Sequence, residues 1–449
     1  MTPPRVKKTL TRDDVVRLDR AHVWHPYTPI DVWERTDPIV VARAEGSSLY
    51  DADGTRYIDG NSSWWVAGLG HGHPRLVRAL REQAETLVHC ALGGIAHEPS
   101  AALAAELVRI APAGLNRVFY TDNGSTSVEV AVKVALQTWQ HLGAPKKTRF
   151  VALDGAFHGD TLGASSLGGV EVFRRPFASV LFECVRAPFP EPAAYERAFA
   201  AMSEVVRKEH DTIAAVVVEP LLQGAAGMRT YDPAYLRALR ELTKAHDVLL
   251  IVDEVFTGYG RTGAMWATGH AGITPDVMCL GKGFCPLFPM GATMVTDRVY
   301  DSFRGSDDRA LWYGHTFCGN PLGAAIAREV LAIYEEEAIV AQVRAKAPRI
   351  TAAFERIAAI PGVARVRSLG MTGAADLEPG SRGSGKSGGA GTSYLGHAGW
   401  RVYEEARRRG AYLRPLGDTV YVCPPLVIGE RDLDDLLGIL EESVRAALG

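Results

Sequence analysis

Six short β-rich apolar runs, separated by longer helical stretches, occupy the middle of the chain and restrict its fold more than any other feature. They are RVFYT (117–121), RFVAL (149–153), IAAVVVE (213–219), VLLIVD (248–253), DVMCL (276–280) and GATMVT (291–296). Several are apolar at every position, which is typical of strands covered on both faces of a parallel sheet. Strands that alternate with helices predict an α/β fold, with helices on both faces of a mostly parallel sheet.

The stretch between the first two runs has the pattern of an amphipathic helix. Val128, Val132, Ala135 and Trp139 recur at helical spacing, with polar residues on the opposite stripe. Thr126 and Glu129 at its start predict a capping box.

A chain of 449 residues is too long for one compact core and suits two or three packed domains. We expect residues 61–335 to form a large domain around the parallel sheet. Residues 1–60 contain the β-rich stretch SSLYDADGTRYIDG, and residues 336–449 contain helical stretches and a second mixed region. These two terminal segments are expected to form a smaller α+β domain. Residues 378–399 are rich in Gly and Ser and read as a flexible loop.

Composition argues against several classes of protein. A net charge of -3 gives no basic excess for nucleic acid or anionic lipid. No apolar run approaches the roughly 20 residues needed to span a bilayer, and MTPPRVKKTLTRDD lacks the apolar region of a signal peptide. The six cysteines show no CxxC pair, which favours reduced thiols in a cytoplasmic protein and no metal site.

Small and chemically active residues follow five of the predicted strands. In an open parallel sheet, ligands bind where the carboxyl ends of the strands meet. Each residue alone has an ordinary structural explanation, such as a helix cap, a core phenylalanine or a surface lysine. Their coincidence at one sheet edge favours a ligand site. The segments are Asp122–Ser125, Gly155–Asp160, Glu219–Pro220, Asp253–Glu254 and Gly281–Gly283.

Asp253 ends the apolar run 248–253, and a lone buried charge costs several kcal/mol unless something pairs with it. Pyridoxal phosphate chemistry accounts for this carboxylate and for the other residues. Gly124 and Ser125 at a helix N-terminus suit the phosphate, and Phe157 suits the face of the ring. Asp253 would then face a protonated pyridine nitrogen. Lys282 would form the Schiff base and move a proton between substrate and cofactor.

The chain resembles the class III (ω-type) aminotransferases of fold type I, which depend on pyridoxal 5'-phosphate. The matching stretches span most of the chain, and their order and spacing are specific. They are DNGSTSVEVAVKVA, FHGDTLGA, AAVVVEPLLQGAAGM, LLIVDEVFTGYGRTG, PDVMCLGKG and HTFCGNPLGAA. The resemblance implies a large domain with a mostly parallel sheet and a smaller α+β domain.

Within that class, the chain looks most like the members that act in biotin synthesis. Four stretches carry this narrower match: VWHPYTP (23–29), DGNSSWWVAGLGHGHP (59–74), LGGIAHEP (92–99) and RPLGDTVYVCPP (414–425). The implied reaction converts 8-amino-7-oxononanoate to 7,8-diaminononanoate with S-adenosyl-L-methionine as amino donor. The implied assembly is a homodimer with its active sites at the subunit interface.

The same resemblance implies a role for each of the following residues. The cofactor-binding set is Gly124, Ser125, Phe157, Glu219, Asp253, Val255 and Lys282, together with His315 and Thr316 from the other subunit. The substrate-binding set is Tyr27, Trp64, Trp65, Phe157, Gly314, Arg414 and Tyr421. In these sets Val255 packs on the cofactor ring, and Arg414 receives the oxononanoate carboxylate. Lys282 and Asp253 are the catalytic pair.

The sequence departs from this pattern in four places. Phe157 stands where tyrosine is common, and Asn123 replaces a serine. Phe284-Cys285-Pro286-Leu287 replaces a glycine-rich turn, so this loop is expected to have another shape. The stretch SLGGVEVFRRPF (166–177) looks more like relatives that use lysine as donor.

The alternatives therefore include lysine as donor and an ω-amino-acid:pyruvate aminotransferase. Residues 380–387 fit G-x-x-x-x-G-K-[ST], but no apolar strand precedes them and no helix follows, which argues against a nucleoside triphosphatase.

Overall fold

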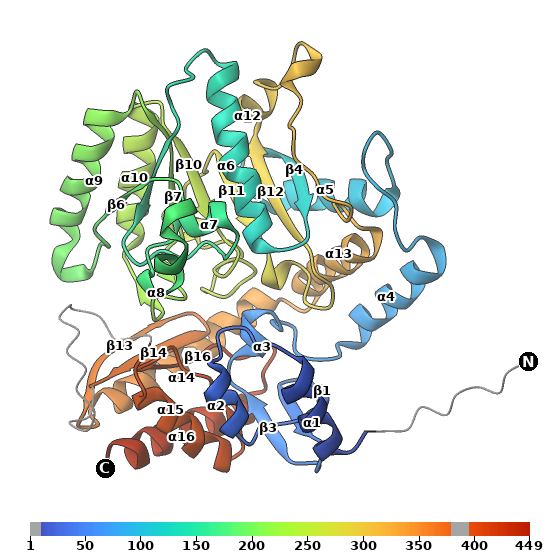
Figure 1. Cartoon of the computed structure of the whole chain (residues 1–449), viewed down its shortest axis with the longest axis vertical. Coiled ribbons are helices and arrows are strands. Elements are labelled where there is room, and N and C mark those ends of the chain that lie inside the picture. Colours follow the sequence, from blue (N-terminus) through green and yellow to red (C-terminus); the bar gives the residue numbers. More distant parts are fainter. Residues whose placement is uncertain (1–9, 379–394) are drawn as a thin grey trace, which may run out of the picture.

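The computed structural model describes residues 10–378 and 395–449, which form two lobes (Figure 1). The upper lobe in the figure contains the large central sheet, and the lower lobe contains two smaller sheets. Most of the expected flexible loop at 378–399, and all of the phosphate-loop-like pattern at 380–387, lie outside the described residues. No helix in the described part of the chain has the length and apolar character needed to cross a membrane.

The central sheet has seven strands in the order β4-β12-β11-β10-β7-β5-β6. Their bounds are β4 Leu115–Thr121, β5 Arg149–Leu153, β6 Cys184–Ala187, β7 Ile213–Val218, β10 Leu249–Asp253, β11 Val277–Leu280 and β12 Gly291–Thr296. Only β12 runs antiparallel to its neighbours. The six predicted strands and the mostly parallel sheet are confirmed, whereas the short strand β6 was not predicted.

Helices cover both faces of this sheet, as the apolar runs predicted. Alternate residues of β10 point to opposite cores: Leu250 and Val252 pack with α9 (Tyr195–Glu209) and α10 (Pro233–Ala245). Leu249 and Ile251 pack with α6 (Gly124–His141) on the other face. The remaining large-lobe helices are α4 Pro74–Thr86, α5 Glu98–Ile110, α7 Leu162–Leu167, α8 Glu171–Arg174, α11 Thr268–Ala271, α12 Asp297–Asp301 and α13 Pro321–Glu336.

The predicted capping box of α6 is wrong. The helix begins earlier, and Asn123 is the N-cap residue, because its side chain accepts the N–H of Thr126 at 2.9 Å. Glu129 instead accepts the N–H of Ala164 at 3.0 Å and a hydrogen bond from the hydroxyl of Thr161. This carboxylate therefore ties α6 to the start of α7.

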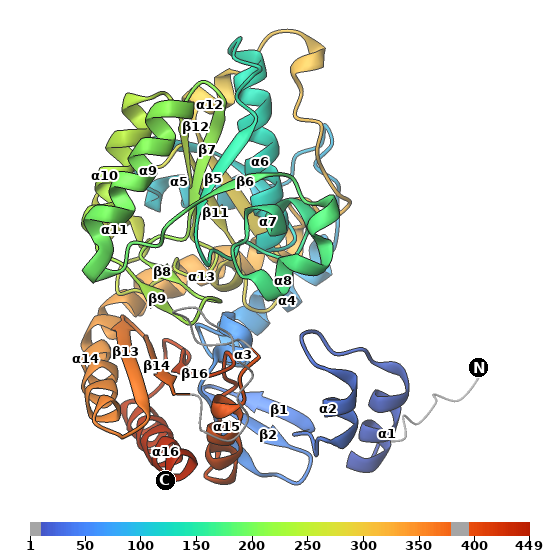
Figure 2. The same cartoon turned by 60° about the vertical axis from the view of Figure 1, so that its left-hand side comes forward.

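The lower lobe combines segments from both ends of the chain (Figure 2). In its four-stranded sheet, β15 (Ala411–Tyr412) runs parallel to β3 (Arg56–Asp59), next to β2 (Ser48–Asp51) and β1 (Val41–Glu45). The other sheet contains β13 Val363–Leu369, β14 Thr372–Leu377 and β16 Thr419–Val422. The helices of this lobe are α1 Arg12–His22, α2 Ile30–Arg35, α14 Ile339–Ala358, α15 Ala398–Arg408 and α16 Glu430–Leu448. The division of the chain at residues 60 and 335 stays a prediction.

Strand β14 packs tightly against α14, and this contact can be tested with one methyl group. A Cβ on Gly373 would lie 2.3 Å from a ring carbon of Phe354 and 2.7 Å from Ile350 Cγ2. Gly373→Ala should therefore destabilise the protein by about 1–3 kcal/mol through overpacking. Thermal unfolding of the holoenzyme measures the effect.

Gly438→Ala is the matched control. Gly438 lies in α16, and a Cβ there meets nothing within 4 Å. This variant should gain about 0.5–1 kcal/mol from helix propensity. Equal effects of the two substitutions would contradict the packing of β14 on α14.

Candidate active site

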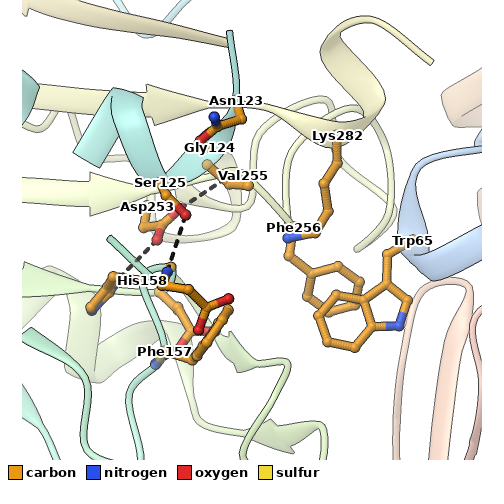
Figure 3. A pocket seen from close by; sticks show the side chains of 13 residues that line it. Trp65, Asn123, Gly124, Ser125, Phe157, His158, Asp253, Val255, Phe256 and Lys282 are labelled. Atoms are coloured by element: carbon orange, nitrogen blue, oxygen red, sulfur yellow. Dashed lines mark hydrogen bonds and ion pairs between the residues drawn. The ribbon is translucent and has the colours of Figure 1, made fainter. Parts of the chain in front are cut away.

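A cavity of about 250 Å³ lies where the carboxyl ends of β4, β5, β7, β10 and β11 meet (Figure 3). Thirteen residues line it: Trp65, Asn123, Gly124, Ser125, Phe157, His158, Gly159, Asp160, Glu219, Asp253, Val255, Phe256 and Lys282. Eight of these were predicted as site residues, and all five strand-end segments named from the sequence contribute at least one residue. The strand-end rule therefore located the cavity.

Asp253 is buried at the end of β10, with 4% of its surface exposed. Its Oδ1 accepts the N–H of Val255 at 3.0 Å, and its Oδ2 lies 2.8 Å from His158 Nδ1. Among the described residues, no arginine or lysine forms an ion pair with this carboxylate. The charge is thus held in place with room beside it for a cationic ligand group.

Lys282 follows β11 and reaches toward the cavity from the side opposite Asp253 and His158 (Figure 3). Its Nζ lies 5.2 Å from the centre of the Trp65 ring and 5.8 Å from that of Phe256. Burial lowers the pKa of Lys282, while the charges of Asp253 and Glu219 oppose that change. A lysine whose neutral form is favoured is a better nucleophile and base.

The loop after Lys282 lacks the glycine-rich turn expected from the resemblance, and its backbone conformation does not require one. Lys282 itself has φ +46°, and none of Phe284, Cys285 and Leu287 has a positive φ. Phe284 and Cys285 are buried in the core. Lys282 itself therefore adopts the left-handed conformation. Because Phe284, Cys285 and Leu287 have negative φ, these positions do not need to be glycine.

The N-terminus of α6 forms a tight cradle that only small residues fit. A Cβ on Gly124 would lie 2.5 Å from Val255 Cγ1, and one on Gly159 would lie 2.1 Å from Ser125 Oγ. Ser125 Oγ also accepts the N–H of Asp160 at 3.2 Å. Backbone N–H groups at a helix N-terminus favour a phosphate, so Gly124 and Ser125 lie where an anion would bind.

Glu219 holds two loops beside the cavity. Its carboxylate accepts the N–H of Phe157 at 3.0 Å and that of Gly224 at 3.0 Å. Burial raises the pKa of Glu219 to about 7, with His158 lowering it and Asp253 raising it. The fixed backbone of Phe157 places its ring in the cavity (Figure 3).

Four of the predicted substrate residues lie outside the cavity lining but next to it. Tyr27 donates to Asp160, and its ring centre is 5.5 Å from that of Trp64. The Arg414 guanidinium lies 4.8 Å from the Trp64 ring centre. Tyr421 is buried and accepts a hydrogen bond from Trp65 Nε1 at 3.0 Å. These side chains extend the site into the lower lobe.

The predicted residues Gly314, His315 and Thr316 do not line the cavity of their own chain. Gly314 and Thr316 are exposed, and His315 Nε2 lies 3.8 Å from Asp122 Oδ1. Their expected contribution to a second subunit's site stays a prediction.

Five lining residues were given no role in binding or catalysis from the sequence: Asn123, His158, Gly159, Asp160 and Phe256. His158 and Asp160 belong to a strand-end segment that was identified, and Phe256 follows the ring-packing candidate Val255. The strand-end position was the available signal, but nothing in the sequence showed which side chains turn toward the cavity.

His71 and His73, just before α4, each lie beside an acid. His71 Nε2 is 2.8 Å from Asp59, and His73 Nε2 is 3.8 Å from Glu337. In residues 10–378 and 395–449, no three His, Cys, Asp or Glu side chains gather where they could hold a metal ion.

The sequence pattern of the family described as "Aminotransferase class-III" matches residues 30–444. The chain belongs to this family, and it is a pyridoxal-phosphate-dependent aminotransferase with the fold type I architecture. The site fits that cofactor, because it combines a glycine-serine cradle, a buried carboxylate with no lysine or arginine partner among the described residues, and a lysine with a lowered pKa.

Relatives named adenosylmethionine-8-amino-7-oxononanoate aminotransferase match nearly the whole chain, and two of them serve as examples. The protein from Geobacter sulfurreducens is 39% identical over 96% of this chain and 97% of its own length. The protein from Synechococcus elongatus is 42% identical over 94% of this chain and 98% of its own length.

Solved structures show the same architecture. The enzyme of that name from Methanocaldococcus jannaschii has a TM-score of 0.91 at 32% identity, covering 97% of this chain and 99% of its own. An (S)-enantioselective ω-transaminase from Thermomicrobium roseum has a TM-score of 0.92 at 28% identity, covering 98% of this chain and 100% of its own.

The raised pKa of Glu219 predicts a pH-dependent stability. The folded state holds the proton up to about pH 7, whereas the unfolded state releases it near pH 4.5. The folded state therefore binds more protons between these values, so this group's contribution to stability is present at low pH and is lost as pH rises. Between pH 4.5 and 7.5 the apoenzyme should lose about 1–3 kcal/mol relative to Glu219→Gln. Thermal unfolding of both proteins across this range measures the difference, and a constant difference would contradict the assignment.

Proposed function

We propose that the enzyme transfers an amino group from S-adenosyl-L-methionine to 8-amino-7-oxononanoate and forms 7,8-diaminononanoate for biotin synthesis. The observation that carries the proposal is the near-full-length match to relatives of that name. The stretches containing Tyr27, Trp64 and Arg414, which suggested this reaction from the sequence, lie together beside the cavity.

The enzyme's own residues can bind both the cofactor and a carboxylate substrate. Pyridoxal phosphate, when bound, supplies an electron-accepting ring and carries the amino group between the two half-reactions. Asp253 stabilises a protonated ring nitrogen, and His158 keeps this carboxylate oriented through Nδ1. The Lys282 amine can take a proton from the substrate carbon and return it, because its lowered pKa favours the neutral form.

Arg414 is the proposed partner of the substrate carboxylate. Its backbone N–H donates to Asn61 at 2.6 Å, which fixes the chain at this point. Within the described ranges, its guanidinium pairs with no carboxylate and packs on Trp64 and Trp400. A guanidinium supported by aromatic faces is ready for a bidentate carboxylate ligand.

A homodimer is the proposed assembly, in a reducing cytoplasmic compartment. Two exposed aromatic side chains, Trp312 at 71% and Phe317 at 52%, flank the exposed Thr316. Large exposed apolar side chains of this kind favour an interface. The six cysteines are free thiols.

An ω-amino-acid:pyruvate aminotransferase is the second candidate. It is supported by the close structural similarity to ω-transaminases at 28% identity. Phe157, in place of a tyrosine, gives the pocket one polar group fewer than the first reaction's relatives commonly have.

The choice of donor and acceptor can be tested directly. Holoenzyme is incubated with 8-amino-7-oxononanoate and either adenosylmethionine or lysine, and 7,8-diaminononanoate is measured by mass spectrometry. We expect product with adenosylmethionine, and at least about 10²–10⁴-fold less with Lys282→Ala, which lacks the catalytic amine. Lys146→Ala, an exposed lysine, is the control. The proposal would be overturned if the enzyme turned over β-alanine with pyruvate but formed no 7,8-diaminononanoate with either donor. Formation of 7,8-diaminononanoate with lysine only would change the donor.

Arg414→Ala should weaken binding of the carboxylate substrate. A hydrogen bond to a charged group contributes about 1.5–3 kcal/mol, so KM for 8-amino-7-oxononanoate should rise roughly 10- to 150-fold. The rise should be larger than any loss of kcat. Arg431→Ala, at a side chain that is 95% exposed, is the matched control. An unchanged KM would remove Arg414 from the substrate site.

A further inference from the structure

Four consecutive residues, Ser62–Trp65, have left-handed backbone conformations. Their φ angles are +48°, +46°, +67° and +74°. The turn is hydrogen-bonded like a helix, because the N–H of Trp65 donates to the carbonyl of Asn61 at 2.8 Å. Nowhere else in the described ranges do two consecutive non-glycine residues have positive φ. Ordinary L-residues avoid this region, so the turn must be held by its surroundings.

Hydrogen bonds to the C-terminal part of the chain hold the turn. The hydroxyl of Ser62, which is fully buried, donates to the carbonyl of Cys423 at 2.7 Å. The N–H of Cys423 donates to the carbonyl of Gly60 at 2.7 Å, and the N–H of Arg414 donates to the side chain of Asn61. The turn therefore keeps its shape through the Ser62 side chain and through the two residues that precede the turn, Gly60 and Asn61.

The turn directs two adjacent tryptophans to two parts of the site. Trp65 is 6% exposed and lies over the Lys282 amine and against Phe256. Trp64 is 42% exposed and lies under the Arg414 guanidinium and beside Tyr27. Aromatic faces stabilise nearby cations, so one short segment places a ring at the lysine and another at the arginine.

We infer that the left-handed turn Ser62–Trp65 is a positioning element that sets the substrate affinity of the enzyme by fixing Trp64 and Trp65 together. This inference rests on the proposed function for the identity of the substrates. Its basis is the backbone conformation: any residue that disfavours positive φ at this turn should displace both rings.

Ser63 allows the backbone to be tested separately from side-chain contacts. It is exposed, and its hydroxyl makes no hydrogen bond to any of the residues that the structure describes. Glycine and asparagine accept positive φ readily, whereas the β-branched valine and threonine do not. Each pair combines residues of different polarity. Activity should therefore depend on whether the residue at position 63 accepts positive φ, and not on the polarity of its side chain.

The holoenzymes Ser63→Gly and Ser63→Asn should keep KM for both substrates within about twofold of the wild type. Ser63→Val and Ser63→Thr should raise both KM values at least about 10-fold, with a smaller change in kcat. They should also change the near-ultraviolet circular dichroism in the tryptophan bands. This spectrum needs no substrate, so it tests the turn even if the proposed reaction proves wrong.

Ala338→Val is the matched control for backbone strain alone. Ala338 is exposed, has φ +50° and precedes α14, away from the cavity. This variant should lower the thermal midpoint but leave both KM values within about twofold. Unchanged KM values and spectra in Ser63→Val would overturn the inference, as would equal losses in all four Ser63 variants.

Discussion

The buried carboxylate of Asp253 is the interaction on which the site depends. Two donors fix its orientation, the N–H of Val255 and the ring of His158, and no lysine or arginine among the described residues pairs with it. Such a group is costly to bury, so its surroundings favour a bound cation. The lysine on the other side of the cavity has its pKa lowered by the same burial. One desolvated pocket thus makes the aspartate attract a cation and makes the lysine favour its neutral form.

The order of strands in the sheet brings these groups together. The cradle follows β4, Phe157 and His158 follow β5, Glu219 follows β7, and Lys282 follows β11. All of these strands point their carboxyl ends to one edge, because only β12 runs in the opposite direction. The lower lobe adds the tryptophans and Arg414 at that edge. The predicted cofactor-binding residues are therefore attached to the sheet, and most of the predicted substrate-binding residues come from the other lobe.

The sequence predicted the sheet well because its strands are uniformly apolar, and the strand-end rule then located the cavity. Strand β6 was missed because its four residues, CVRA, are only partly buried and carry a charge. The start of α6 was misplaced because Asn123 and Thr126 are both good caps. The left-handed turn could not be predicted, since serine and tryptophan do not favour positive φ and its hydrogen bonds come from residues some 360 positions later. The expected role of Thr316 in a second subunit's site stays a prediction.

The parallel pairing of β3 with β15 has a consequence for how the chain acquires its structure. The two strands are separated by roughly 350 residues, and translation at about 5–20 residues per second takes some 20–70 s to cover that distance. The large lobe can fold on the ribosome during this delay, whereas the edge of β3 stays without its partner until synthesis is nearly complete. An exposed strand edge promotes aggregation. The unpaired edge of β3 is therefore the part of the nascent N-terminal segment that most needs protection from aggregation until β15 is synthesised.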